Sequence, residues 1–346
     1  MDPSTSMLII AVVLVVVFDF TNGFHDASNM VATMIASRAM APGPALLLVG
    51  TATFLGPIIG GVAVADTVAN MVDLSDLPEL TAMGVVCSGL FGAILWNFST
   101  WALGVPSSSS FALFGALAGA TLHAAGSDHV VWGIEAARQG HFIGFTAVLA
   151  ALMLSPLLGL VLGAVAMRIS KLLLRRATPR ANRGLRRLQW ITSAALAFSH
   201  GTNDAQKGMG ILALVLLLSK QQQTLTVPVW VIGLCATSIT LGTLSGGWRI
   251  IRTLGYGIYK IRPVHALDSQ IVSALVIFAA GQLGGPVSTT HVVTTSIMGV
   301  GAAEHPRRVR WAKAREIGMT WVSTLPASAL VGALVHAGVA LVFPSG

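Results

Sequence analysis

Long stretches without Asp, Glu, Lys or Arg alternate along the chain with short polar segments. The uncharged stretches cover residues 45–65, 80–127, 142–167, 227–248 and 317–346. A helix needs about 20 apolar residues to cross a bilayer, and only helices or closed barrels satisfy their backbone polar groups in lipid. These stretches are rich in Leu, Val, Ala and Gly and lack strict alternation, which indicates helices. The pattern therefore predicts an all-α polytopic membrane protein.

The composition supports a membrane protein and argues against several other classes. The 346 residues include 21 Lys and Arg and 13 Asp and Glu, for a net charge of +8. Only 10% of the residues are charged and 54% are hydrophobic, whereas soluble domains carry about 25% charged residues. A disordered chain is excluded, and both a soluble enzyme and a nucleic-acid binder are disfavoured. Cys87 and Cys235 form no disulfide framework and no zinc motif.

The basic residues predict the orientation in the membrane. Seventeen of the 21 lie within residues 168–187, 249–262 and 307–315, and short basic loops stay cytoplasmic. All three clusters fall on one side of the membrane if the chain crosses as follows. It crosses once at each of residues 7–37, 45–70, 142–167, 188–218, 227–248 and 318–343, and an even number of times at 80–123 and at 269–303. The apolar run 7–18 has no cleavage site of small residues after it, so it is interpreted as the first span. We therefore expect a multi-pass protein of the cell membrane, surrounded by lipid, with both termini outside.

The two halves of the chain repeat each other. Residues 1–167 and 188–346 each comprise two spans, an uncharged pair and a further span, and the basic loop 168–187 joins them. The motif HDASN at 25–29 matches NDAQK at 203–207, and PSSSSF at 106–111 matches PVSTTH at 286–291. Because each half crosses the membrane an odd number of times, the repeats are inverted. Inverted repeats are typical of secondary transporters.

The uncharged pair of each half favours a re-entrant helical hairpin. Segments 269–285 and 288–303 are short for full spans and are separated by Gly-Gly-Pro and hydroxyl residues. Two half-length helices that meet at such a break place the hairpin tip near the middle of the membrane. Two full spans would give the same crossing parity, so that alternative stays open.

Two carboxylates lie inside membrane segments. A charge there costs about 3 kcal/mol on insertion scales and marks an ion path, so Asp26 and Asp204 are candidate cation ligands. Gly23 and Gly201, three residues before each aspartate, would let the helices bend or unwind, and the freed carbonyls would hold a cation. The alternative is a structural pair between Asp204 and Lys207, one turn apart.

Hydroxyl residues gather at both expected hairpin tips, at 107–110 and 288–290. The second helix of a hairpin begins there, so its first backbone N–H groups are unpaired. Free N–H groups, hydroxyl donors and the positive end of the helix dipole together form an anion site. Ordinary N-capping is the alternative.

Other titratable residues adjoin these motifs and have open roles. Lys207 either neutralises the anion or pairs with Asp204. Asp19, seven residues before Asp26, either joins a proton path or faces a polar crevice without a role in transport. His25, His200 and His291 either relay protons or bind the anion when charged, or serve as hydrogen-bonded structural residues.

Four motifs in order resemble the signatures of the inorganic phosphate transporter family. They are NGFHDASN at 22–29, PSSSSF at 106–111, SHGTNDAQKG at 199–208 and GPVSTTH at 285–291. The resemblance covers nearly the whole chain. It implies an inverted-repeat helical transporter that moves phosphate with a coupling cation and often forms a homodimer. It assigns cation binding to Asp26, Asn29, Asn203 and Asp204, and phosphate binding to Ser108, Ser109, Ser110, Ser288, Thr289 and Thr290.

Three departures refine this resemblance. His25 stands where many members have Asn, and Gln206-Lys207 stands where many have Ala-Asn; both variants resemble the bacterial low-affinity branch, associated with proton coupling and metal-phosphate uptake. Phe111 replaces the His that usually ends the first tip motif, so that His has no role here. Lys207, which we place among the phosphate-binding residues, brings a fixed positive charge and weakens a sodium-coupled reading.

We therefore expect a secondary active importer of inorganic phosphate, either free or as a metal-phosphate complex. It is coupled to a cation gradient, with the proton favoured over sodium, and works by alternating access. Alternatives are a sulfate permease of the same fold and a sodium-coupled phosphate symporter. An intramembrane serine hydrolase is disfavoured because no Gly-x-Ser-x-Gly motif is present, so no enzyme activity and no cofactor are expected. A resident metal site is neither predicted nor excluded.

Overall fold

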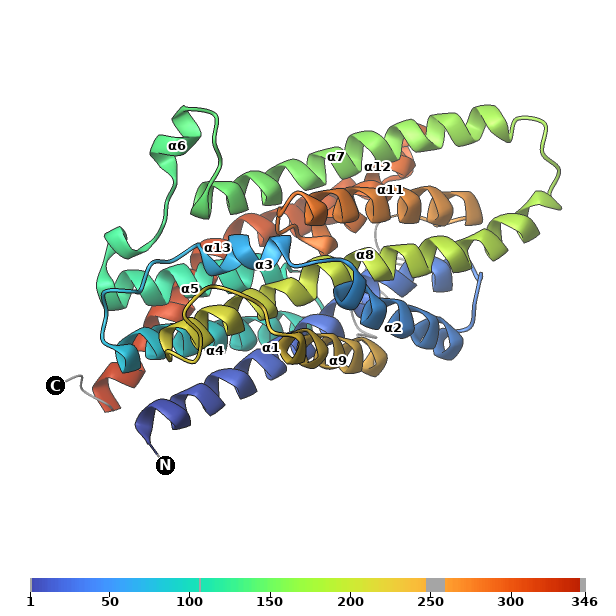
Figure 1. Ribbon diagram of the computed structural model, residues 1–346. Helices are drawn as coiled ribbons and strands as arrows, with labels where there is room; N and C mark the ends of the chain where they lie inside the picture. The colour runs from blue at the N-terminus through green and yellow to red at the C-terminus, as the bar shows by residue number, and fades with distance from the viewer. Residues whose placement is uncertain (1, 106, 247–258, 343–346) are drawn as a thin grey trace.

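The computed structural model describes residues 2–105, 107–246 and 259–342 as a bundle of helices (Figure 1). The helices are α1 (Pro3–Ala36), α2 (Pro42–Ile59), α3 (Ala63–Ala69), α4 (Glu79–Leu103), α5 (Ser109–Ala125), α6 (Ile134–Arg138), α7 (Gly144–Leu173), α8 (Ala181–Leu218), α9 (Val229–Ser245), α11 (Pro263–Gln282), α12 (Thr289–Glu304) and α13 (Trp311–Val342), with 3₁₀ turns η1 (Ser127–His129) and η2 (Pro306–Arg308). Within the described ranges the β-structure is confined to an isolated bridge between Val72 and Val130.

The helices have the length and composition of membrane spans. Among the described residues six are long and apolar enough to cross a bilayer: α1, α2, α4, α7, α11 and residues 314–341 of α13. Helix α8 is longer still, at 38 residues, but its polar motif makes it less apolar. Large apolar side chains such as Leu103, Leu275 and Leu341 are exposed on the outside of the bundle, as expected for a lipid-facing surface. The predicted all-α polytopic fold is confirmed.

Some predicted boundaries differ from the structure. The segment predicted as one crossing at 45–70 contains two helices, because α2 ends at Ile59 and α3 begins only at Ala63; α2 by itself is long and apolar enough to cross a bilayer. Gly61 between them has φ +83°, in the left-handed region that glycine adopts readily. Helix α11 begins at Pro263 rather than at 269, and by length and composition its 20 residues could cross a bilayer. Of the predicted basic loop 249–262, residues 249–258 lie outside the described ranges.

The pairs α4–α5 and α11–α12 form two helical hairpins that enter from opposite ends of the molecule. Ser4, at the start of α1, donates a hydrogen bond to Glu79 at the start of α4, so the first hairpin opens at this end. Gln270 of α11 donates to Thr33, near the other end of α1, at 2.9 Å. The tips of the two hairpins meet in the interior, where the Ser110 hydroxyl donates to the carbonyl oxygen of Val287 at 3.0 Å.

The last helix of each half packs on the hairpin of the other half. Helix α13 lies along α5, and α7 lies along α12. Both contacts depend on glycine: a Cβ on Gly119 of α5 would lie 1.9 Å from the Ala329 carbonyl oxygen of α13, and one on Gly299 of α12 would lie 2.1 Å from the Leu160 carbonyl oxygen of α7. Close backbone approach at small residues is the usual way that helices associate in membranes. Each hairpin is therefore held by a helix that lies in the other half of the sequence.

Described residues from each of the three basic clusters lie at the end of the molecule opposite the N-terminus. Lys171 of α7 donates to the carbonyl oxygen of Ala303 at 2.9 Å, and Arg262 pairs with Glu304. Desolvation and the positive charges of Arg308, Lys171 and Arg262 lower the pKa of His305. One residue from each of the three clusters therefore lies near His305. Helix α13 ends at the other end of the bundle, where α1 begins (Figure 1). Which end faces the cytoplasm stays a prediction from the charge pattern.

Candidate functional site

Glycines bring the two motif helices close to their neighbours. A Cβ on Gly23 of α1 would lie 2.0 Å from the Ile239 carbonyl oxygen of α9, and one on Gly201 of α8 would lie 2.2 Å from the Thr53 carbonyl oxygen of α2. Helices α1 and α8 continue regularly through both positions. The predicted bend or unwinding is therefore wrong for this structure. These glycines serve close packing and free no carbonyl for a cation.

The polar side chains of α1 and α8 share one face of each helix. On α8 these are His200, Asp204 and Lys207, and on α1 they are Asn22, Asp26 and Asn29, at the same spacing of i, i+4 and i+7. That spacing returns to one side of an α-helix. All six side chains are buried, and α1 packs on α8, so the two polar faces form the interior of the bundle.

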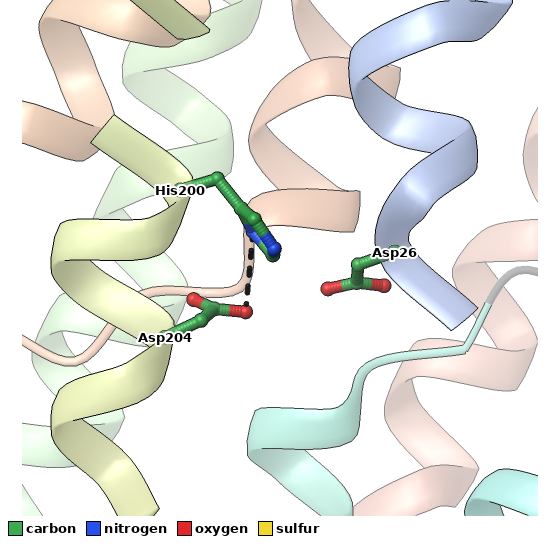
Figure 2. Close-up of side chains that lie close together, drawn as sticks. All are labelled: Asp26, His200 and Asp204. Carbon is green, nitrogen blue, oxygen red and sulfur yellow. Dashed lines mark ion pairs between the residues drawn. The ribbon is translucent and has the colours of Figure 1, made fainter. Parts of the chain in front are cut away.

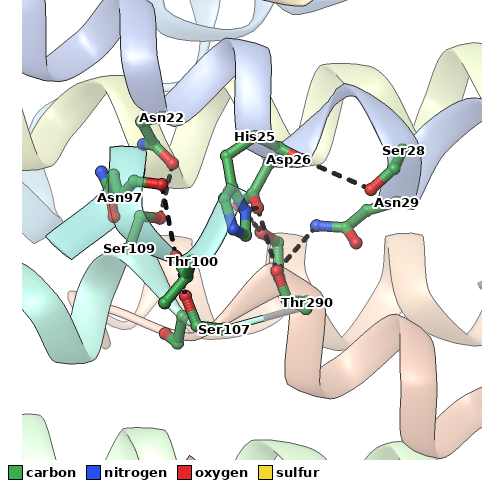
Figure 3. A network of polar contacts seen from close by, with 12 residues as sticks. Asn22, His25, Asp26, Ser28, Asn29, Asn97, Thr100, Ser107, Ser109 and Thr290 are labelled. Carbon is green, nitrogen blue, oxygen red and sulfur yellow. Dashed lines mark hydrogen bonds and ion pairs between the residues drawn. The ribbon is translucent and has the colours of Figure 1, made fainter. Parts of the chain in front are cut away.

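The second hairpin tip supplies donors to both carboxylates. Thr289 donates to Asp26 Oδ2 at 2.8 Å and lies 3.5 Å from Asp204 Oδ2. Thr290 donates to Asp26 Oδ1 at 2.9 Å and accepts from the Asn29 amide at 3.0 Å. His25 Nδ1 lies 3.1 Å from Asp26 Oδ1 (Figure 3). Hydroxyl donors from residues more than 260 positions along the chain therefore stabilise the Asp26 carboxylate.

Lys207 joins both tips to α8. Its ammonium donates to Asp204 Oδ1 at 2.7 Å, to Ser110 Oγ at 2.5 Å and to the Val287 carbonyl oxygen at 3.0 Å. The Lys207 and Asp204 side chains have no exposed surface. An ammonium has three donors, and all three are used here. Of the two roles left open for Lys207, the structure contains the pair with Asp204.

The hydroxyl residues of the tips fall into two groups. Ser108 and Ser288 are the N-caps of α5 and α12, and they accept hydrogen bonds from Phe111 N and His291 N at 3.2 and 3.3 Å. The neighbouring hydroxyls bind other helices instead: Ser109 donates to Asn22 Oδ1 at 2.6 Å. Ser107 donates to Thr100 of α4 at 2.8 Å, within its own hairpin. Capping therefore explains one hydroxyl in each tip, and Ser109, Thr289 and Thr290 bind the polar side chains of α1.

Three ionisable groups converge at a candidate cation site. Asp26, His200 and Asp204 each offer a ligand atom, and these atoms all lie within 4.8 Å of one another (Figure 2). His200 Nδ1 is 3.5 Å from Asp204 Oδ2, and neither ring nitrogen of His200 makes a hydrogen bond in the described structure. Two carboxylate oxygens and one imidazole nitrogen form a donor set that suits a proton or a divalent transition metal better than sodium.

The structure modifies the predicted cation set. His200 lies in the cluster, although only the two carboxylates and the two asparagines were predicted as cation ligands. Its position one helical turn before Asp204 was the feature of the sequence that indicated its closeness to that carboxylate. Asn203 is occupied at the second tip, where its amide donates to the Gly285 carbonyl oxygen at 3.0 Å and accepts from Val287 N at 3.2 Å. Asn29 retains a buried side-chain oxygen without a partner in the described residues.

Comparison with known proteins places the chain in a family. A model described as the phosphate transporter family matches residues 22–332. The chain belongs to the phosphate transporter family. Relatives in this family include a probable low-affinity inorganic phosphate transporter of Bacillus subtilis (strain 168), 40% identical over 97% of this chain and 98% of the relative. One of Rhizobium meliloti (strain 1021) is 39% identical over 95% and 96%.

A solved structure shows that the family fold is shared. The structure of "the sodium-dependent phosphate transporter" matches with a TM-score of 0.87, covering 98% of this chain and 100% of that chain, at 22% identity. At that identity the likeness is one of fold alone.

The residues that the family resemblance assigns all lie in one buried region. They are Ser108, Ser109, Ser110, Ser288, Thr289, Thr290, Asp26, Asn29, Asn203 and Asp204, with Lys207 in addition, and each is buried. The hydrogen bonds described above connect them to one another or to the same tips. Their division into phosphate-binding and cation-binding residues stays a prediction.

Proposed function

We propose that this protein imports inorganic phosphate across the cell membrane, coupled to a cation gradient, by alternating access. The observation that carries the proposal is the meeting of two hydroxyl-rich helix N-termini, from opposite ends of the molecule, at two carboxylates and one lysine. In this proposal the hydroxyls that now bind Asn22, Asp26 and the Val287 carbonyl exchange those partners for phosphate oxygens. The relatives named as phosphate transporters support this choice of anion.

The charges of the site favour cation coupling. Asp26 and Asp204 carry −2 in their ionised forms, and Lys207 returns +1, so the buried site has a net charge of −1. A phosphate anion adds further negative charge in this buried region, and burying unpaired charge is costly. Cations or protons that enter with phosphate offset it. If the phosphate and its coupled cations together carry a net positive charge, the membrane potential drives them inward with about 2.3 kcal/mol per charge per 100 mV.

Within this proposal the proton is favoured over sodium. His25, His200 and His291 are all buried around Asp26 and Asp204, and a histidine ring can accept a proton on one nitrogen and release one from the other. An imidazole in the candidate cation site is a poor ligand for sodium, which prefers oxygen. The same donor set suits a divalent metal, so uptake of phosphate as a metal-phosphate complex fits the site as well.

The membrane arrangement is part of the same proposal. The two halves are inverted repeats, both hairpins are re-entrant with their tips near the midplane, and both termini lie outside. The opposite entry of the hairpins and the common location of the basic clusters support this arrangement. A homodimer is proposed from the family resemblance.

Uptake of radiolabelled phosphate into proteoliposomes tests the function directly. We expect accumulation under an inward proton gradient and little under a sodium gradient. No uptake under either gradient would refute the proposal, and uptake under sodium alone would shift it to a sodium symporter. Excess unlabelled sulfate distinguishes the remaining alternative, because a sulfate permease would lose phosphate uptake in its presence.

A further inference from the structure

Helix α1 carries a third buried carboxylate that the site described above does not use. Asp19 lies seven residues before Asp26, about two turns away on the same face of the helix, and it has no exposed surface. Neither of its oxygens accepts a hydrogen bond from an N–H or O–H group of the described residues. Asp26 and Asp204, by contrast, accept hydrogen bonds from threonine hydroxyls and from the Lys207 ammonium.

The surroundings of Asp19 are close-packed. A Cβ on Gly208 of α8 would lie 2.4 Å from Asp19 Oδ2, so the carboxyl group rests against the backbone next to Lys207. The Cys235 thiol of α9 is placed to hydrogen-bond with Asp19, and Asp204 and Lys207 of α8 act on it through their charges. A thiol is a weak donor and does not supply the hydrogen bonds that a carboxylate needs.

The other helices packed on α1 bring no closer base or acid to Asp19. Helix α2 has no titratable side chain, and α4 has Cys87 and, at its start, Glu79. Helices α11 and α12 meet α1 toward its far end; their titratable residues are His265, Asp268, His291 and Glu304. In the state described here Lys207 is bound to Asp204, so a charged carboxylate at Asp19 would be buried with only a weak thiol donor, and such a group is costly. The neutral acid is the form that this packing accommodates.

We propose that Asp19 is the proton-carrying residue of the transport cycle. The inference rests on the proposed function and deepens it by naming the coupling site. In the state described here the Asp19 carboxyl holds its proton. In the inward-facing state the O–H bond breaks, the proton passes to water on the inner side, and a carboxylate remains; a proton from outside restores the acid in the outward-facing state.

The position of Asp19 connects its proton to the phosphate site. Lys207 ties Ser110 of the first tip to Val287 of the second. A negative charge on Asp19 competes with Asp204 for the Lys207 ammonium and so weakens the link between the tips. Proton release and the opening of the tips are thereby coupled through one lysine.

Asp19→Asn in proteoliposomes tests the proposal, because Asn imitates the neutral acid in size. A gradient of one pH unit sustains about tenfold accumulation per coupled proton. We expect Asp19→Asn to lose accumulation driven by the pH gradient but to retain exchange of labelled for unlabelled phosphate at equal pH. Asp268→Asn is the matched control: Asp268 is also buried, but it accepts a hydrogen bond from Ser170 at 2.7 Å, and this variant should accumulate phosphate like the wild type.

Two results would overturn the proposal. If Asp19→Asn still accumulates phosphate under the pH gradient, the proton is carried elsewhere; if it loses exchange as well, Asp19 has a structural or binding role. Difference infrared spectra give a readout independent of transport: the carbonyl stretch of a protonated acid should be present in the wild type and in Asp268→Asn and absent in Asp19→Asn. A wild type without any uptake would refute the proposed function, and the infrared band would still decide whether Asp19 is protonated.

Discussion

The buried pair of Lys207 and Asp204 allows a quantitative test of the site. Replacing Lys207 by Met keeps the length of the side chain and removes its three hydrogen bonds, of 2.5, 2.7 and 3.0 Å. Asp204 is then left as an unpaired charge with no exposed surface. Removing one partner of a buried pair costs about 3–5 kcal/mol. We expect Lys207→Met to lower the free energy of unfolding by this amount and to abolish phosphate uptake.

Two further variants separate the lost pair from simple loss of packing. The double variant Lys207→Met, Asp204→Asn removes both charges, so it should recover stability, with an interaction energy of about 0.5–3 kcal/mol in the double-mutant cycle. Lys220→Met changes an exposed lysine just beyond α8 and should stay within about 0.5 kcal/mol of the wild type. Denaturant unfolding in detergent measures these three variants and the single variant Asp204→Asn, which the cycle also needs. A Lys207→Met protein as stable as the wild type would refute the reasoning.

Two predictions concern the hairpins. Gly119→Ala places a methyl group 1.9 Å from the Ala329 carbonyl oxygen, so α5 and α13 must separate and we expect a lower melting temperature. Gly184→Ala is the control: Gly184 has open space around it, so this variant should melt like the wild type. Thr290→Val keeps the side-chain shape but removes the donor that lies 2.9 Å from Asp26 Oδ1, a loss of about 1–3 kcal/mol, or ~5–150-fold. Phosphate uptake at low concentration should fall by that factor, and unchanged uptake would contradict a role of Thr290 in stabilising this carboxylate.

Local sequence patterns predicted some residues of the site and missed how others are arranged. Asp26, Asp204 and the tip hydroxyls were predicted because charged and polar residues inside apolar segments stand out in the sequence. The closeness of His200 to Asp26 was not predicted, because it depends on how α1 packs against α8. Gly23 and Gly201 were misinterpreted for a related reason: a glycine that allows a bend and one that allows close packing look alike in a sequence.

The sequence alone determined the class of the protein, the order of its helices, the repeat and the motif residues, because hydrophobic runs and motif spacing are local properties of the chain. Only the tertiary structure decided which groups meet. Thr289 reaches Asp26 across 263 positions, and Ser110 reaches Val287 across 177. The isolation of Asp19 likewise depends on the neighbours that helix packing brings or withholds. Such contacts arise from the packing of whole helices, which no local pattern specifies.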